Sequence, residues 1–132
     1  MWKEMYRKGI VPVLWKDEYK NFDYTIQPIT GEELAEWKSQ GYTHESVTGK
    51  MYDSRNPMPE WVTTVSDFIG LKNCGYVFYR MDTLDIMPTH VDHFNTYCRV
   101  FNVERKNVKR AIVFLENWKP GHYFEVAGDR KS

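Results

Sequence analysis

The clearest pattern of apolar positions lies in the second half of the chain, where short β-favouring runs are separated by turn residues. Four runs rich in aromatic and branched side chains predict strands over residues 75–81, 86–94, 110–116 and 122–126. The continuous apolar stretch inside residues 110–116 predicts a strand that is buried on both faces. Polar residues with Pro or Gly predict turns over residues 82–85, 117–121 and 127–132.

Helical patterns lie in the first half of the chain, over residues 31–40 and 60–68. Thr30 and Glu33 form a capping box before the first helix, and Gly41 supplies its stop. Apolar residues at helical spacing are expected to face a core, and these are Trp37 in the first helix and Trp61, Val65 and Phe68 in the second.

The rest of the first half is irregular. Short strands are predicted over residues 10–15 and 24–29, and Pro12 makes the first of them an edge or terminal strand. Residues 42–57 carry Gly, Ser, Asn and Pro and predict a loop. Residues 97–103 fit a strand or a short helix.

Helices followed by strands with short connections are typical of an α+β fold, with N-terminal helices beside a mostly antiparallel sheet. A chain of 132 residues predicts a single domain. Residues 1–74 would form its helical and irregular part, and residues 75–132 its strands.

The charge balance and the two cysteines exclude several classes of partner and site. Lys and Arg balance Asp and Glu at 18 each, so we expect neither nucleic acid nor a membrane as partner. The basic run at residues 105–110 fits a solvated loop better than a phosphate-binding patch. We expect no signal peptide and no membrane span. Cys74 and Cys98 lack metal-ligand spacing, and two buried thiols in the cytoplasm are favoured over a disulfide.

The candidate chemistry lies in residues 87–94, which place two imidazoles and one carboxylate within four positions. On a strand, His90 and Asp92 point to one side and His93 to the other. An imidazole and a carboxylate can supply two corners of a 2-His-1-carboxylate iron site. Pro88 could instead open a helix, on which His90 and His93 would share a face. The apolar spacing favours the strand. His44 fits a solvated loop.

Several segments together resemble the iron(II)- and 2-oxoglutarate-dependent oxygenases, in the branch found in phage and marine bacterial genomes and related to prolyl and aspartyl/asparaginyl hydroxylases. The resemblance covers about residues 75–128, and it is carried by residues 79–81, 86–94, 110–115 and 118–124. It implies a partial double-stranded β-helix, which is a jelly-roll or cupin-like fold, in which residues 75–132 supply the first core strands.

The same resemblance implies a function. His90 and Asp92 would bind Fe(II), and 2-oxoglutarate would be the cosubstrate, converted to succinate and CO₂ as a small molecule or peptide is hydroxylated. The expected location is the cytoplasm of a bacterium or of a phage-infected host cell.

The chain departs from the family pattern at four points. The family's distal His and 2-oxoglutarate-anchoring Arg would follow Ser132, Leu84 stands near the place of an expected Gly, and Met81 replaces a Tyr. We therefore expect the front part of an oxygenase, with weak or absent turnover by itself. A homodimer through an exposed sheet edge is a further expectation.

Two alternatives remain open. One is a non-catalytic, cupin-like module that binds a small ligand or a metal between aromatic walls. The other is a structural zinc site that draws on His90, Asp92, His93 or His122. Zinc requires a closed tetrahedral set, and His90 with His93 would be a poor pair on opposite strand faces.

Overall fold

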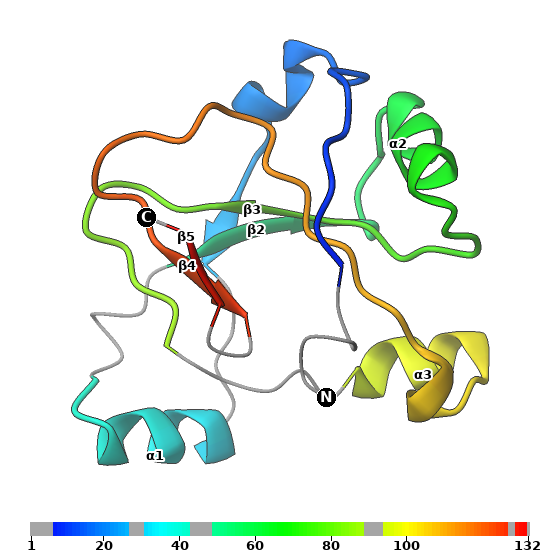
Figure 1. The fold of residues 1–132 in the computed structure, drawn as a ribbon. Helices are drawn as coiled ribbons and strands as arrows, with labels where there is room; N and C mark the ends of the chain where they lie inside the picture. The colour runs from blue at the N-terminus through cyan, green and yellow to red at the C-terminus, as the bar shows by residue number, and fades with distance from the viewer. Residues whose placement is uncertain (1–6, 27–30, 43–48, 89–93, 127–128, 132) are drawn as a thin grey trace.

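The computed structural model describes residues 7–26, 31–42, 49–88, 94–126 and 129–131, and it shows short helices beside two small antiparallel sheets (Figure 1). The predicted α+β class is confirmed. In chain order the elements are the 3₁₀ helix η2 (Asp17–Asn21), β1 (Thr25–Ile26), α1 (Gly31–Ser39), β2 (Lys50–Asp53), α2 (Trp61–Ile69), β3 (Val77–Arg80), α3 (Asn95–Phe101), the 3₁₀ helix η4 (Arg105–Asn107), β4 (Phe124–Val126) and β5 (Asp129–Lys131).

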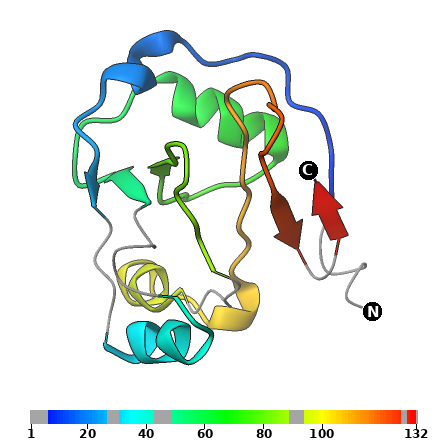
Figure 2. The ribbon, with the colours of Figure 1, turned by 90° about the vertical axis from the view of Figure 1, so that its left-hand side faces the viewer.

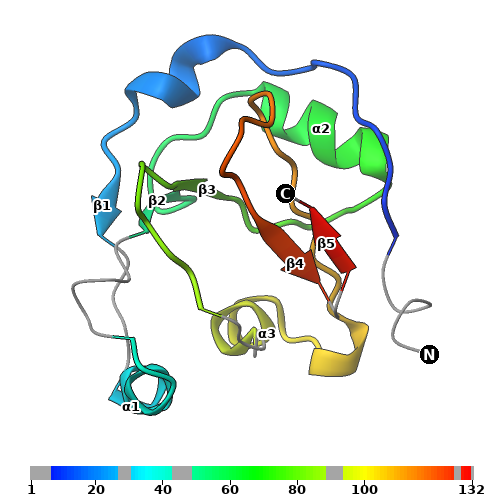
Figure 3. The ribbon, with the colours of Figure 1, turned by 60° about the vertical axis from the view of Figure 1, so that its left-hand side comes forward.

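The larger sheet has three antiparallel strands in the order β1-β2-β3, so β2 is central. Its register places Lys50 opposite Arg80 and Tyr52 opposite Phe78. β4 and β5 form a separate antiparallel hairpin. Helix α2 lies on one side of the three-stranded sheet, and α1 and α3 lie toward the opposite side (Figures 2 and 3).

The core joins the sheet to α2 through aromatic rings. Phe22 stacks on Tyr52 with ring centroids 4.2 Å apart, and Phe78 meets Phe22 edge-on at 5.2 Å. Phe78 also meets Trp61 of α2 edge-on at 5.6 Å. Offset-stacked and edge-to-face pairs are the favoured geometries for aromatic rings. The buried residues of this cluster are Tyr19, Trp61, Val62 and Val65.

Both predicted helices are confirmed. Gly41 and Gly70 follow them with φ values of 93° and 88°, in the left-handed region that glycine adopts without a steric penalty. The Gly70 N–H closes the end of α2 by donating to the carbonyls of Ser66 and Asp67. The helices therefore stop where the sequence indicates.

The predicted core residues of these helices are confirmed except for one. Trp37, Trp61 and Val65 are buried, but Phe68 is 56% exposed. Val62 is buried instead, because the face of α2 that meets the sheet is centred between Val62 and Val65. Phe68 lies at the margin of that face, in the last turn.

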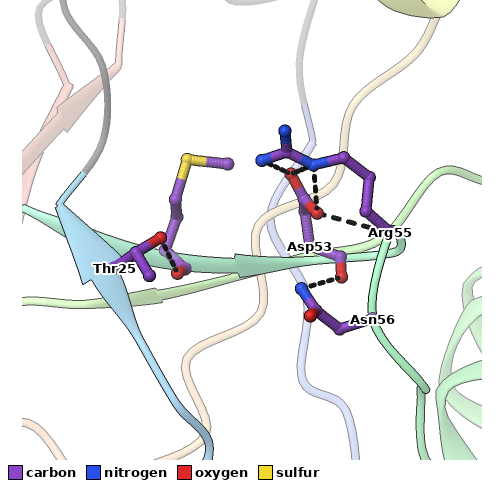
Figure 4. A network of polar contacts seen from close by, with 5 residues as sticks. Thr25, Asp53, Arg55 and Asn56 are labelled. Carbon is purple, nitrogen blue, oxygen red and sulfur yellow. Dashed lines mark hydrogen bonds and ion pairs between the residues drawn. The ribbon is translucent and has the colours of Figure 1, made fainter.

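The prediction of a loop over residues 42–57 is wrong at β2. The Lys-Met-Tyr-Asp sequence of this strand has no strong apolar pattern, and neighbours on both sides provide its hydrogen bonds. Figure 4 shows how it ends: the Asp53 carboxylate accepts from the Nε and backbone N–H of Arg55 at 2.9 and 3.1 Å, and the Asp53 carbonyl accepts from Asn56. Arg55 lowers the pKa of Asp53, mainly through this side-chain hydrogen bond.

Strands at residues 24–29, 75–81 and 122–126 are confirmed in shorter form as β1, β3 and β4, and residues 97–103 are largely helical, within α3. The strand over residues 10–15 is wrong. That segment pairs with no strand in the described part of the chain, and Val11, Leu14 and Trp15 pack against the core without one. The turn over residues 127–132 is wrong at β5.

The strand over residues 110–116 is also wrong. These residues cross the molecule as an extended trace, but they join no sheet (Figure 1). Val113 and Leu115 are half-buried against the core, whereas Ile112 and Phe114 are exposed. An apolar run indicates contact with a core, but a ladder also needs a neighbouring strand, and none lies beside this run in the described residues.

Because aromatic rings join α2 to the sheet, we expect substitutions at two positions of this helix to lower the free energy of unfolding by unequal amounts. Trp61→Ala removes a buried indole whose Nε1–H donates to Glu18 at 2.6 Å, and we expect a loss of about 3–5 kcal/mol in the free energy of unfolding. Phe68→Ala is the matched control, and it should cost less than about 1 kcal/mol because the ring is mostly exposed. Urea unfolding followed by circular dichroism measures both values, and equal losses would contradict the assigned core.

Candidate functional site

The residues of the predicted metal pair, His90 and Asp92, lie outside the described residues, as do His93 and His44. The predicted strand over residues 86–94 is wrong where the structure describes it. Residues 86–88 join no strand, and Phe94 has a φ of 56° immediately before α3. The site is therefore built from the two flanks of residues 89–93.

The upstream flank is fixed by close packing. A Cβ placed on Gly49 would lie 3.3 Å from Cε of Met87, so glycine lets the start of β2 approach this side chain. Pro88 is buried. The turn before it is closed by hydrogen bonds in both directions, because the Asp82 N–H donates to the Asp85 carboxylate and the Asp85 N–H donates to the Asp82 carbonyl. The chain thus reaches residue 89 from a packed position.

The downstream flank is tied to the loop before β3. The Tyr97 hydroxyl donates to the Asn73 carbonyl at 2.8 Å, and a Cβ on Gly75 would touch the Tyr97 ring at 3.7 Å. Phe101 stacks on Tyr97 with centroids 4.4 Å apart. Helix α3 is therefore anchored at its middle, three residues after Phe94.

A charged cluster lies at the end of the sheet next to the upstream flank. Lys50 and Arg80 face each other across β2 and β3, and like charges at such positions repel. The Asp82 carboxylate lies between them, with Lys50 Nζ at 3.0 Å from one oxygen and Arg80 Nε at 2.9 Å from the other. The hydrogen bond from Lys50, followed by that from Arg80, lowers the pKa of Asp82. The Asp85 carboxylate accepts from the Asp82 N–H at 2.7 Å, so two cations lie beside two carboxylates and the local formal charge is zero.

His122 is in the structure but is not oriented as a metal ligand. Its Nδ1 accepts a hydrogen bond from the Lys119 backbone N–H at 3.2 Å, and its ring meets Trp118 edge-on at 5.3 Å. A neutral imidazole that accepts at Nδ1 carries its proton on Nε2, so neither nitrogen is open to a metal without breaking this arrangement. Zinc binding at His122 Nδ1 would therefore require this hydrogen bond to be broken.

Metal-binding side chains do not gather elsewhere in the described residues, where no group of three or more His, Cys, Asp or Glu is close enough to hold an ion. Cys74 and Cys98 are free thiols, as predicted, but both are half-buried rather than buried.

A separate hollow of about 430 Å³ lies where η2 meets α2. It contains none of the residues predicted to form a site, and its lining is Lys16, Glu18, Glu60, Trp61 and Thr64.

No protein-family model, curated protein or solved structure matches this chain. Among the described helices, none is long and apolar enough to cross a membrane.

Sequence reasoning missed the cluster of Lys50, Arg80 and Asp82. Arg80 and Asp82 are near each other in sequence, but Lys50 is 30 residues away and joins them only through the register of β2 and β3. No local motif marks such a contact. Recognising β2 as a strand would have been the necessary signal.

The contacts in the cluster of Lys50, Arg80 and Asp82 predict how the pKa of Asp82 responds to substitution. Replacing Lys50 with Met should raise the pKa of Asp82 toward its ordinary value of 3.8, because the hydrogen bond that lowers it most is lost. Carboxyl ¹³C NMR measures this pKa. In the native chain the folded-state pKa is below 3.8, so the stabilisation by these ion pairs is fully present above 3.8 and is lost as the pH falls through the folded-state value.

Lys20→Met is the control for this titration. In the native chain Lys20 pairs with Asp17 on η2, with Nζ 3.4 Å from the carboxylate. The substitution removes the same positive charge as Lys50→Met does. The pKa of Asp82 should not respond to it, and an equal response to both variants would show that net charge rather than the local contact sets the value.

Proposed function

We propose that the chain belongs to an Fe(II)- and 2-oxoglutarate-dependent oxygenase of the hydroxylase type, in which His90 and Asp92 are two of the iron ligands. The observation that carries this proposal is the His90-Val91-Asp92 spacing in a segment whose two flanks are both held by packing. An imidazole with a carboxylate is a donor set that suits Fe(II) with open positions. The third protein ligand is not assigned.

The finer fold belongs to the same proposal. A double-stranded β-helix, or jelly roll, needs two antiparallel sheets built by a single chain. The sheet of β1, β2 and β3 and the hairpin of β4 and β5 support this arrangement, since the two are separate and both are antiparallel. The aromatic residues between strands would then serve as walls of the site.

2-Oxoglutarate enters the proposal as the cosubstrate of the proposed family. Near the flank that leads to His90, Lys50 and Arg80 are balanced by the carboxylates of Asp82 and Asp85, so this cluster by itself favours neither an anion nor a cation. Bound iron and 2-oxoglutarate would supply oxidative chemistry toward a C–H bond, and this chain's residues would orient the two and exclude water.

Anaerobic titration with Fe(II) and 2-oxoglutarate tests the proposal without relying on turnover. The joint complex should give a weak visible charge-transfer band, and the band should be lost in His90→Ala and in Asp92→Ala because each removes a ligand. His93→Ala is the matched control next to the pair. Together with His122→Ala, it should retain the band.

Two outcomes would contradict the proposal. Tight zinc binding that is indifferent to 2-oxoglutarate would favour a structural zinc site. Binding of metal or of a small ligand with no coupling to 2-oxoglutarate would favour the non-catalytic, cupin-like module. Isothermal titration calorimetry with each component alone and in combination separates the three readings.

A further inference from the structure

Residues 111–115 run in extended form and the chain bends at Glu116, and residues 111–117 belong to no helix or sheet. They follow η4 and cross the molecule in Figures 1 and 2. Within the part of the chain that the structure describes, none of their N–H or C=O groups bonds to another backbone group. Such groups beside apolar side chains are a template for pairing with a further strand.

The side chains along this run alternate as they do in a strand. Val113 and Leu115 are half-buried against the core cluster beneath α2. Ile112 is 50% exposed and Phe114 is 45% exposed, although the Phe114 ring also meets Trp118 edge-on. One side of the run is thus anchored, and the other offers apolar surface to a partner.

A formal net charge of zero adds no long-range repulsion between two copies of the chain.

We propose that residues 110–116 pair with the same residues of a second copy of this chain, antiparallel about a two-fold axis at Val113. In this register Arg110 lies opposite Glu116 of the second copy, and Ile112 lies opposite Phe114 of the second copy. Each of these cross-strand pairs occurs twice in the dimer, as two-fold symmetry requires. The inference does not depend on the proposed oxygenase activity.

The sequence Arg-Ala-Ile-Val-Phe-Leu-Glu selects this register. Opposite charges stand at equal distances from Val113, so antiparallel pairing about that residue brings unlike charges together at both ends. Parallel pairing in register would place Arg110 opposite Arg110. Antiparallel pairing centred on Phe114 would place Ile112 opposite Glu116, an apolar side chain opposite a charge.

The two charged side chains have local neighbours that are compatible with this role. The Arg110 guanidinium lies 5.7 Å from the centre of the Tyr79 ring, and a cation over a ring can still donate at its edge. The Glu116 carboxylate lies close enough to Tyr19 to raise the pKa of its hydroxyl, after the larger effect of burial. A carboxylate has acceptor positions for a tyrosine and for an arginine together.

Charge reversal tests the pairing. Arg110→Glu and Glu116→Arg, each alone, place like charges opposite each other twice, and we expect the dissociation constant of the dimer to rise by roughly tenfold or more. An equimolar mixture of the two variants should restore the dimer, because every charged pair is then complementary. Sedimentation velocity over a concentration series measures all three. The recovery on mixing also excludes misfolding as the cause of the loss.

Arg105→Glu is the control for the charge change, since Arg105 is exposed in η4 and lies outside the paired residues. It should leave the dissociation constant unchanged. A native chain that remains monomeric across the series would overturn the proposal, and so would single variants that associate as the native chain does. Assembly beyond a dimer would overturn the closed two-fold arrangement.

A cysteine placed on the axis tests the register. In a background of Cys74→Ser and Cys98→Ser, Val113→Cys brings two thiols opposite each other across the dimer, at a spacing that a disulfide can span. Phe114→Cys is the matched neighbour, and its two thiols would be offset along the strands. Non-reducing electrophoresis after mild oxidation should show faster cross-linking at position 113, and equal or reversed rates would refute the register.

Discussion

The contact on which the rest of the structure depends is the row of rings that runs from Tyr52 through Phe22 and Phe78 to Trp61. It joins β2, β3 and α2 to the segment after η2, and these parts are far apart in sequence. Because the three-stranded sheet is small, its hydrogen bonds alone would not fix its position, and small sheets need a packed face to be stable. Trp61 of α2 packs against that face through Phe78, and its indole N–H donates a hydrogen bond to Glu18.

The same sheet sets the geometry next to the predicted metal pair. Pairing of β2 with β3 brings Lys50 and Arg80 together, and Asp82 offsets their repulsion. Gly49, one residue before Lys50, leaves the space that Met87 fills. The register of two strands therefore decides both the charge near the proposed site and the position from which the chain approaches His90.

Residues 111–117 show how an apolar pattern and a pairing partner are separate requirements. The run Ala-Ile-Val-Phe-Leu is the most strand-like stretch of the chain, and Val113 with Leu115 does reach the core. Its backbone groups nevertheless pair with no other strand among the described residues. Hydrophobicity predicts which side chains leave water, whereas a ladder depends on which other segment arrives alongside.

Local chemistry in the sequence was sufficient for the ends of α1 and α2, because Gly41 and Gly70 are needed where a helix turns into a left-handed residue. It was also sufficient for the α+β class and for two of the four buried residues of α2, Trp61 and Val65. Only tertiary structure made a strand of Lys50–Asp53 and turned Phe68 toward solvent. The first outcome depends on neighbouring strands that are distant in sequence, and the second depends on the rotation of a helix, so neither is encoded in a local pattern.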